Sequence, residues 1–174
     1  AKIIADFSKS ISNFLDIKSG PVIFLGNEFF DSIPIKQFKR NNNQFFEKYY
    51  FLDKFNTIKH GYTKASFKDS QNLKKYQSLK KSNFIEFPKM GFRMLENIIQ
   101  KIYVNSGGIL LIDYGYTNSL NKNTIQSLIK HKKNEVFKNI GKADITYLVN
   151  FKLLKEFFEN KKLKNTNIVS QGFF

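Results

Sequence analysis

The sequence predicts an α/β fold in which a mostly parallel sheet is interrupted by an inserted antiparallel β meander. Two continuous apolar runs, Val22–Leu25 and Ile109–Ile112, have the composition of strands buried in a parallel sheet. An amphipathic stretch, Met90–Val104, lies directly before the second run, and a helix leading into a parallel strand makes a right-handed βαβ crossover the economical topology. Between the two runs, Ile35–Tyr62 consists of short β-like segments separated by polar turns.

The first predicted elements are a helix and a strand. Apolar residues recur at spacings of three and four over Ile3–Leu15, which suits one face of a helix. Ser19-Gly20-Pro21 then ends this helix. The continuous apolar run Val22–Leu25 predicts a strand that is buried on both faces.

Beyond this strand the chain changes to aromatic β-like runs. They are Ile35–Arg40, Phe45–Leu52 and Phe55–Tyr62. Asn tolerates the left-handed backbone of tight turns, and aromatic side chains favour pleated surfaces, so a small antiparallel meander is expected. Because it interrupts the alternation of strands and helices, we interpret it as an insertion that covers or extends a site. The Lys-rich stretch Lys64–Lys81 is expected to be a mobile loop or a loosely held helix.

The second half of the chain begins with a core helix over Met90–Val104. Its apolar stripe consists of Met94, Leu95, Ile98, Ile99 and Ile102. Gly107-Gly108 is expected to supply the left-handed stop of this helix, and Ile109–Ile112 is the second buried strand. Farther on, Gly141–Thr146 is expected to lead into a helix, with Asp144 at an ordinary helix start. The apolar stripe of that helix consists of Phe151, Leu154, Phe157 and Phe158.

Composition favours one globular domain over residues 1–174, with residues 35–83 as the insertion. A chain of 174 residues with 41% hydrophobic content is long and apolar enough to bury a core. Cysteine is absent, which excludes disulfides and thiolate metal sites, and His60 and His131 are the only imidazoles. We therefore expect no metal site. The apolar runs are far shorter than the roughly 20 residues that cross a bilayer, so no membrane span is expected.

The net charge of +15 raises the possibility of nucleic-acid binding. However, Arg40 and Arg93 are the only arginines, whereas base and phosphate recognition favours the guanidinium group. The lysines are scattered, which favours a solvated lysine surface with a general attraction to acidic partners. We expect no nucleic-acid partner. The chain begins at Ala1 without a Met or a secretory signal, so a cytosolic-type compartment is the default and a longer parent protein is expected.

The loop after the first predicted strand carries the densest group of polar side chains. Asn27, Glu28 and Asp31 place a carboxamide and two carboxylates directly after Val22–Leu25. In open α/β sheets, ligands bind at the carboxyl ends of the strands. Glu28, Asp31 and Asn27 are therefore the catalytic candidates. The alternative is that Asn27 or Asp31 merely caps a short helix, since Asn and Asp are favoured caps.

The second predicted strand also ends in polar residues, Asp113 and Tyr114. Asp113 could face a cofactor or acceptor cleft, or it could cap the following turn through Gly115, and the sequence leaves both roles open. Phe30 and Tyr114 are candidate substrate contacts, although packing is the favoured interpretation for Phe30. His131 is a further candidate, but a lone His in a basic run is more often solvated.

Three blocks of sequence occur in one order at wide separation: Gly26–Phe38, Gly107–Tyr116 and Gly141–Phe151. Together they resemble the MidA-like family of S-adenosylmethionine-dependent methyltransferases. That family includes a mitochondrial protein arginine methyltransferase that serves the assembly of respiratory complex I. The similarity runs through nearly all of the chain and is weakest between Gln44 and Asn83.

The resemblance implies a partial class I methyltransferase fold, which is Rossmann-like, with S-adenosylmethionine as the cofactor. It implies a protein substrate, with an arginine of a respiratory complex I subunit as the expected acceptor. Glu28 and Asp31 would pair with the guanidinium, while Asn27 and Asp113 would lie toward the cofactor. The implied location is the cytoplasm of a bacterium or the mitochondrial matrix of a eukaryote, and the oligomeric state is left open.

The sequence departs from the family pattern in one respect. It contains no Gly-x-Gly, so the glycine-rich cofactor loop of the family is missing, and we expect the chain to be an interior portion of a longer protein that carries the activity. The alternative function is a non-enzymatic assembly factor or interaction module with a methyltransferase-like fold.

Overall fold

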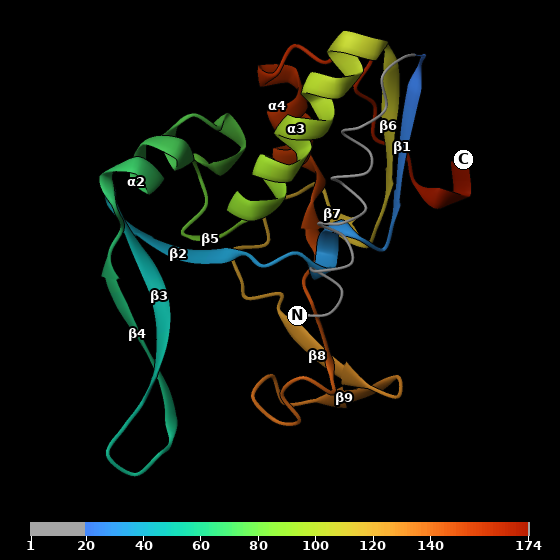
Figure 1. Ribbon diagram of the computed structural model, residues 1–174. Helices are drawn as coiled ribbons and strands as arrows, with labels where there is room; N and C mark the ends of the chain where they lie inside the picture. Colours follow the sequence, from blue (N-terminus) through green and yellow to red (C-terminus); the bar gives the residue numbers. More distant parts are fainter. Residues whose placement is uncertain (1–19, 174) are drawn as a thin grey trace. The chain divides into compact units, whose positions relative to one another are not determined.

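The computed structural model describes residues 20–173, and these divide into two compact units (Figure 1). The first unit contains the described residues up to Ile33 together with Met90–Tyr114 and Thr124–Val149. The second contains Pro34–Lys89, Gly115–Asn123 and the described residues from Asn150 onward. The helix predicted over Ile3–Leu15 lies outside the described residues.

The two predicted apolar strands pair in the first unit. They are β1 (Val22–Asn27) and β6 (Gly107–Ile112), and they run parallel in register from Val22 opposite Gly107 to Asn27 opposite Ile112. The prediction of a parallel pair is confirmed. Because both strands run the same way, their carboxyl ends lie together and the loops that follow them are neighbours.

Helix α3 (Lys89–Asn105) precedes β6 and lies along the sheet in Figure 1. Its predicted apolar stripe is largely confirmed, since Leu95, Ile98, Ile99 and Ile102 are all buried. Each contributes on the order of 1.5 to 3 kcal/mol by burial. These side chains make α3 the main core element of the first unit.

The end of α3 matches the prediction in part. Positive φ angles occur at Gly107, as predicted, and also at Ser106, at φ 63°, which lies before it. Gly107 has a φ of 129°, and a Cβ there would lie 1.8 Å from the Val22 carbonyl oxygen. Gly107 is therefore needed for the close approach of β1 to β6 as well as for its backbone conformation.

The prediction that β1 is buried on both faces is wrong for the described residues. Val22 and Gly26 are buried, but the alternate side chains Ile23 and Leu25 are 80% and 62% exposed. Successive strand residues point to opposite faces, so one face of the β1–β6 pair is covered and the other is open to solvent.

The rest of the first unit includes a small antiparallel sheet in the order β10-β8-β9. Its strands are β8 (Gln126–Ile129), β9 (Lys132–Asn134) and β10 (Asp144–Thr146). The expected helix start at Asp144 is therefore wrong, and the segment pairs as a strand with β8. Ile145 and Thr146 are β-branched and suit a strand.

The second unit is built on a four-stranded antiparallel sheet in the order β4-β3-β2-β5. The strands are β2 (Lys36–Asn41), β3 (Gln44–Leu52), β4 (Ile58–Lys64) and β5 (Phe84–Phe87). The predicted meander is confirmed as β2, β3 and β4. A two-residue turn joins β2 to β3, and Asn42 in that turn has the left-handed φ of 51° that Asn tolerates.

The Lys-rich stretch 64–81 is better ordered than predicted. It contains α2 (Phe67–Lys74) and a 3-10 turn, η2 (Gln77–Leu79). The Ser66 hydroxyl caps α2 by accepting a hydrogen bond from the Asp69 N–H, and Leu73 and Leu79 are buried. A serine N-cap and two buried leucines outweigh the polar composition.

Helix α4 (Phe151–Asn160) completes the second unit. The Asn150 side chain caps it by accepting a hydrogen bond of 3.0 Å from the Leu153 N–H. Its buried side chains are Leu153, Leu154, Phe157 and Phe158. The remaining short elements are β7 (Gly115–Tyr116), β11 (Val149–Asn150), which is the neighbour of β7 in a two-stranded sheet, and the 3-10 turn η3 (Gln171–Phe173).

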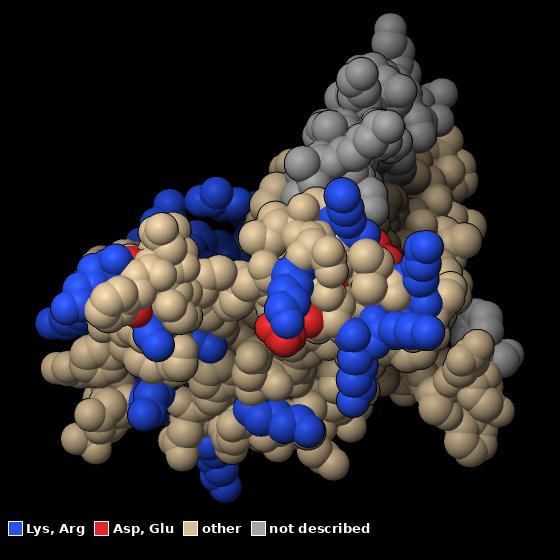
Figure 2. Space-filling view, turned by 90° about the horizontal axis from the view of Figure 1, so that it is seen from below, with Lys and Arg blue, Asp and Glu red and all other residues tan. Residues whose placement is uncertain are grey.

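Lysine side chains are spread over the face shown in Figure 2, with few acidic groups among them. This agrees with the net charge of +15. Within residues 20–173, no helix is both long and apolar enough to span a bilayer.

Candidate functional site

The candidate site lies in the first unit, where the parallel strands β1 and β6 end. Asn27 is the last residue of β1 and lies opposite Ile112, and the Glu28 N–H then donates a hydrogen bond of 2.8 Å to the Ile112 carbonyl oxygen. Glu28 has a φ of 43°, which is unfavourable for a residue with a side chain. The chain turns here into a short 3-10 turn, η1 (Phe30–Ser32), which carries Asp31.

Asp113 organises this loop. One of its carboxylate oxygens, Oδ2, accepts hydrogen bonds from the N–H groups of Phe30 (2.9 Å) and Asp31 (3.1 Å). The other, Oδ1, accepts one from the Tyr114 N–H (2.9 Å). Asp113 therefore holds the start of η1 and also caps the turn that follows β6.

The capping role considered for Asn27 and Asp31 is not seen. The residue before η1 is Phe29, and no side chain in the cap position bonds to this turn. Asp113, which is 83 and 82 residues away from Phe30 and Asp31, takes that role. Neither Asn27 nor Asp31 is thus occupied as a helix cap.

Asp31 is a buried carboxylate in an unusual environment. The residue is only 7% exposed, and its carboxylate oxygen Oδ1 has no hydrogen-bond partner within residues 20–173. Burial, and then the negative charges of Asp113 and Glu28, raise the pKa of Asp31 to about 6, although backbone N–H groups of Ser32 and Asp31 act to lower it. Burial also raises the pKa of Asp113. Three carboxylates thus share one loop region, and within residues 20–173 no cation is among their hydrogen-bond partners.

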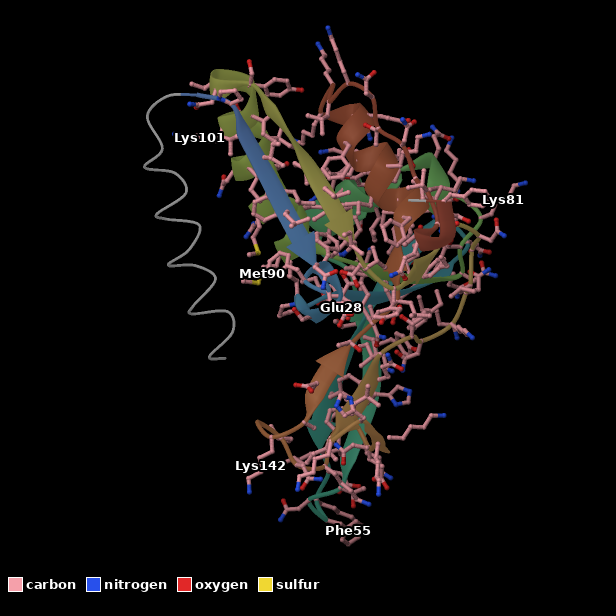
Figure 3. The ribbon with its side chains drawn as sticks, turned by 90° about the vertical axis from the view of Figure 1, so that its right-hand side faces the viewer. Glu28, Phe55, Lys81, Met90, Lys101 and Lys142 are labelled. Carbon is pink, nitrogen blue, oxygen red and sulfur yellow. The ribbon has the colours of Figure 1, made fainter. Side chains whose placement is uncertain are left out.

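Glu28 is the exposed member of this group, as Figure 3 shows at the end of β1. The Tyr114 hydroxyl donates a hydrogen bond of 3.3 Å to Glu28 Oε1. Tyr114 itself is 63% exposed. The pair is therefore open to an incoming ligand, while Asp31 is enclosed.

The structure brings together the side chains of four of the predicted residues. Glu28, Asp31, Asp113 and Tyr114 interact directly or through their charges. Asn27 is exposed at the end of β1. The ring of Phe30 is 1% exposed and packs on Phe92, with ring centroids 6.3 Å apart, so Phe30 is a core residue as the packing interpretation held.

His131 lies elsewhere in the first unit. It occupies the two-residue turn between β8 and β9, together with Lys130, and both residues have positive φ angles. In the described chain it makes no hydrogen bond or ion pair with the carboxylate group. Its role in substrate binding remains a prediction.

Sequence reasoning missed the way Asp113 and Tyr114 build the loop around Asp31. The available signal was that a carboxylate follows each of the two apolar strands, since parallel pairing brings the ends of such strands together. It also missed that the Tyr147 N–H donates a hydrogen bond of 3.1 Å to the Asp31 carbonyl oxygen, which ties η1 to the chain after β10.

Carboxylates grouped in this way could hold either a metal ion or an organic cation. No group of three or more His, Asp or Glu side chains with a metal-binding arrangement occurs in the part of the chain that the structure describes. The Asp113 oxygens are engaged by three backbone N–H groups, so Glu28 and Asp31 are the acceptors best able to receive an organic cation.

Comparison with known proteins gives a family match over almost the whole chain. The sequence profile of a family described as "Putative S-adenosyl-L-methionine-dependent methyltransferase" matches residues 4–169. This range includes the strands, the η1 turn and all four clustered residues.

Curated relatives and a solved structure agree with this match. A protein named as the mitochondrial protein arginine methyltransferase NDUFAF7 homolog of Caenorhabditis elegans is 28% identical over 84% of this chain and 35% of its own length. The NDUFAF7 protein of Danio rerio, also named a mitochondrial protein arginine methyltransferase, is 28% identical over 81% of this chain and 33% of its own length. The chain thus spans about a third of the length of these relatives.

The solved structure is that of a COG1565 superfamily member from Burkholderia thailandensis bound to S-adenosyl-homocysteine. It has a TM-score of 0.61 at 16% identity, and the match covers 80% of this chain and 38% of that chain. At this level of identity the likeness shows that the fold is shared. It confirms the predicted α/β, partly Rossmann-like class.

Proposed function

The chain belongs to the family of S-adenosyl-L-methionine-dependent methyltransferases that its sequence matches, and from this premise we propose that its parent protein methylates arginine side chains of a protein substrate. In this proposal the chain supplies the acceptor side of the site. The names of the curated relatives, which are protein arginine methyltransferases, support the choice of arginine.

The observation that carries the proposal is the buried Asp31 Oδ1 atom without a hydrogen-bond partner in residues 20–173. A buried polar atom without a partner is costly, and a buried charge more so. A cationic acceptor with N–H donors would supply both the missing hydrogen bond and the missing positive charge. Binding a cation would therefore stabilise the site more than binding a neutral group would.

A guanidinium suits these carboxylates because it stays positively charged at any physiological pH and carries five N–H donors. In the proposed arrangement the exposed Glu28 receives the guanidinium first, and the Tyr114 hydroxyl holds Glu28 in position. Asp31, farther inside, then pairs with the nitrogen that is to be methylated. Charge-assisted hydrogen bonds of this kind are short and orient the acceptor nitrogen.

Asp31 also suits the role of proton acceptor. S-adenosylmethionine supplies, when bound, a methyl group on a sulfonium that is open to attack by a nitrogen lone pair. The acceptor nitrogen gains the methyl group and must lose one proton. With its pKa raised to about 6, the Asp31 carboxylate is mostly ionised at pH 7 and is a better base than an ordinary Asp.

The cofactor side of the site is only partly represented in these residues. Asn27 is exposed at the carboxyl end of β1, and its carboxamide can both donate and accept, which fits a contact to a polar cofactor group. Asp113 would act mainly by fixing the loop, since three backbone N–H groups already use its oxygens. We assign the remaining cofactor contacts to the longer parent protein.

The resemblance to the MidA-like family extends the proposal to the substrate and the compartment. A subunit of respiratory complex I is the proposed substrate. The relatives' names include the word mitochondrial, which supports the mitochondrial matrix as the location if the protein is eukaryotic.

The test uses the full-length parent protein, labelled S-adenosylmethionine and candidate protein substrates, with the labelled residue identified by mass spectrometry. We expect label on arginine, and we expect Glu28→Gln and Asp31→Asn to lower kcat/KM by about 100-fold or more. The matched control is Glu159→Gln, because Glu159 is an exposed glutamate on α4 whose 3.8 Å ion pair with Lys155 is on the surface.

Three outcomes would count against the proposal. A folded parent protein that binds no S-adenosylmethionine would favour the alternative of a non-enzymatic assembly factor. Label on lysine or on a chain terminus would remove arginine as the acceptor. Full activity of both carboxylate variants would remove Glu28 and Asp31 from the site.

A further inference from the structure

The exposed aromatic side chains of the second unit gather on one hairpin. We define the hairpin arm as residues 48–62, which contain most of β3, the connecting turn and most of β4. Phe55 in its turn is 75% exposed and Leu52 is 62% exposed. The other exposed large apolar side chains of the arm are Tyr49, Tyr50, Phe51, Ile58 and Tyr62.

The exposure of the arm follows from its strand pairing. Strand β2 pairs with β3 only from Gln44 to Glu47, so within the sheet the arm consists of β3 and β4 alone. Figure 1 shows β3 and β4 continuing beyond β2, and Figure 3 labels Phe55 at the far end. A two-stranded ribbon is marginally stable on its own, and a contiguous apolar surface of this kind marks an interaction site.

Apolar side chains occur on both faces of the arm. In the register of β3 with β4, Leu52 lies opposite Ile58, and both share a face with Tyr62, which lies opposite Lys48. Tyr49 and Phe51 point to the other face, with ring centroids 5.7 Å apart. Since a protein partner usually covers one face, an arm with exposed apolar side chains on both faces is better suited to partial immersion in an apolar medium.

The side chains also change in character along the arm. Leu52, Phe55 and Ile58 lie at or beside the turn, and the tyrosines begin two residue pairs farther back. At about 3.4 Å per residue, the apolar tip is on the order of 10 Å deep and the tyrosines lie just behind it. Interfacial segments bury their apolar face about 5 to 10 Å into the boundary between head groups and acyl chains. Tyrosine is enriched at the head-group level.

The net positive charge of the arm favours an anionic partner. It carries three lysines, Lys48, Lys54 and Lys59, against one carboxylate, Asp53. Asp53 Oδ1 accepts hydrogen bonds of 2.9 Å from the N–H groups of Phe55 and Thr57, so this carboxylate is partly compensated within the turn. The lysine stems can extend their ammonium groups to head-group phosphates while their methylenes stay among the apolar side chains.

The same charge disfavours a second copy of the chain as the partner. The chain carries 29 Lys and Arg against 14 Asp and Glu, so a basic arm meets a basic surface on another copy. The arm contains no arginine, the side chain that phosphate and base recognition favours, which disfavours nucleic acid as the partner. We propose that the hairpin arm inserts its tip into the interfacial region of an anionic lipid bilayer and holds the protein at a membrane surface.

The proposal is tested by co-sedimentation of the full-length parent protein with lipid vesicles. We expect binding to vesicles of phosphatidylcholine with about 30% phosphatidylglycerol, and weaker binding to pure phosphatidylcholine or at high salt. The double variant Leu52→Ser/Phe55→Ser should weaken binding at least about tenfold, because both side chains leave the apolar region. Phe67→Ser is the matched control, since Phe67 is 80% exposed at the start of α2, outside the arm.

A second pair of variants keeps the test independent of folding defects. Lys54→Gln/Lys59→Gln should remove most of the preference for the anionic vesicles and leave the weak binding to neutral ones unchanged. Phe55→Trp should give a fluorescence signal, relative to the unsubstituted protein, that shifts to the blue with anionic vesicles and is quenched by brominated lipid.

The proposal is overturned if the protein does not bind anionic vesicles, or if the arm variants bind as well as the Phe67→Ser control. Dimerisation that the arm variants abolish, without vesicle binding, would assign the arm to a second copy. Salt-sensitive binding of single-stranded RNA through the arm, without vesicle binding, would assign it to nucleic acid. None of these outcomes bears on methyl transfer, which is measured separately.

Discussion

Two buried aspartates, one in each unit, lie in opposite electrostatic environments. Asp31 in the first unit is 7% exposed, has no cation among its hydrogen-bond partners in the described part of the chain and has a pKa raised to about 6. Asp69 in the second unit is 3% exposed but pairs with Lys36 at 3.1 Å and Lys89 at 2.5 Å. Although burial alone would raise the pKa of Asp69, the hydrogen bonds from Lys89, Lys36 and Ser66 lower it.

This difference separates a carboxylate with a structural role from one for which we propose a role in binding the acceptor. The charge of Asp69 is compensated inside the chain, so it stabilises the junction of α2 with the sheet. The charge of Asp31 is opposed by its surroundings, so it lowers stability at neutral pH. Such strain persists at sites where a ligand relieves it. The unpaired carboxylate is therefore the better indicator of function.

The largest effect on stability is expected at Asp69. Asp69→Asn keeps the side-chain volume but leaves the Lys89 ammonium group without its counter-charge, while Lys36 keeps its ion pair with Glu47 at 2.8 Å. Because Lys36 and Lys89 are partly exposed, we expect a loss near the lower end of the range for buried pairs, about 3 kcal/mol in the free energy of unfolding. Urea unfolding at pH 7 measures it, with Glu159→Gln as the control at less than about 0.5 kcal/mol.

A smaller loss is expected at Asp113. Asp113→Asn replaces one of the two acceptor oxygens by an NH2 group, so either the Phe30 and Asp31 N–H groups or the Tyr114 N–H lose their acceptor, but it also removes one negative charge beside Asp31. The net loss of unfolding free energy should be about 1 to 2 kcal/mol. The same substitution should lower the pKa of Asp31, which NMR titration of its carboxyl carbon can follow. An unchanged pKa would show that the two carboxylates are not coupled.

The smallest effect is expected at Tyr114. Its hydroxyl donates a 3.3 Å hydrogen bond to the exposed Glu28, so Tyr114→Phe should change the unfolding free energy by less than about 1 kcal/mol. If Tyr114 orients Glu28 toward the acceptor, KM for the protein substrate should rise several-fold while kcat changes little. A change confined to kcat would instead place Tyr114 at the reacting atoms.

Local pattern was sufficient to predict the elements that position the site. Val22–Leu25 and Ile109–Ile112 are continuous apolar runs, and they do form a parallel pair whose ends carry Asn27 and Asp113. The stripe of α3 and the meander were predictable for the same reason, because period and turn residues are local signals. Helix α2, by contrast, was expected to be a mobile loop or a loosely held helix because of its lysines, although Ser66 caps it and Leu73 is buried.

Contacts between residues far apart in the sequence determine the features that local sequence pattern could not predict. The role of Asp113 in holding η1 depends on hydrogen bonds across 82 and 83 residues, which no periodicity reveals. The exposure of Ile23 and Leu25 depends on which elements cover each face of β1. The burial of Asp31, and hence its raised pKa, likewise follows from tertiary packing around η1.

The most direct test of the account measures stability and activity together in Asp31→Asn. A raised acid pKa means that the folded state binds the proton more tightly than the unfolded state does. The associated stability is therefore present at acid pH and is lost as pH rises from about 4 to about 6. Above that range the ionised Asp31 lowers the unfolding free energy by about 3 kcal/mol, on the order of 1.36 kcal/mol per pKa unit.

We therefore predict that Asp31→Asn raises the free energy of unfolding of the parent protein by about 2 to 3 kcal/mol at pH 7, with little change at pH 4. At the same time, kcat/KM for methyl transfer should fall by about 100-fold or more. A variant that is less stable at pH 7, or one that keeps its activity, would contradict the claim that Asp31 is held ionised and unpaired for a cationic acceptor.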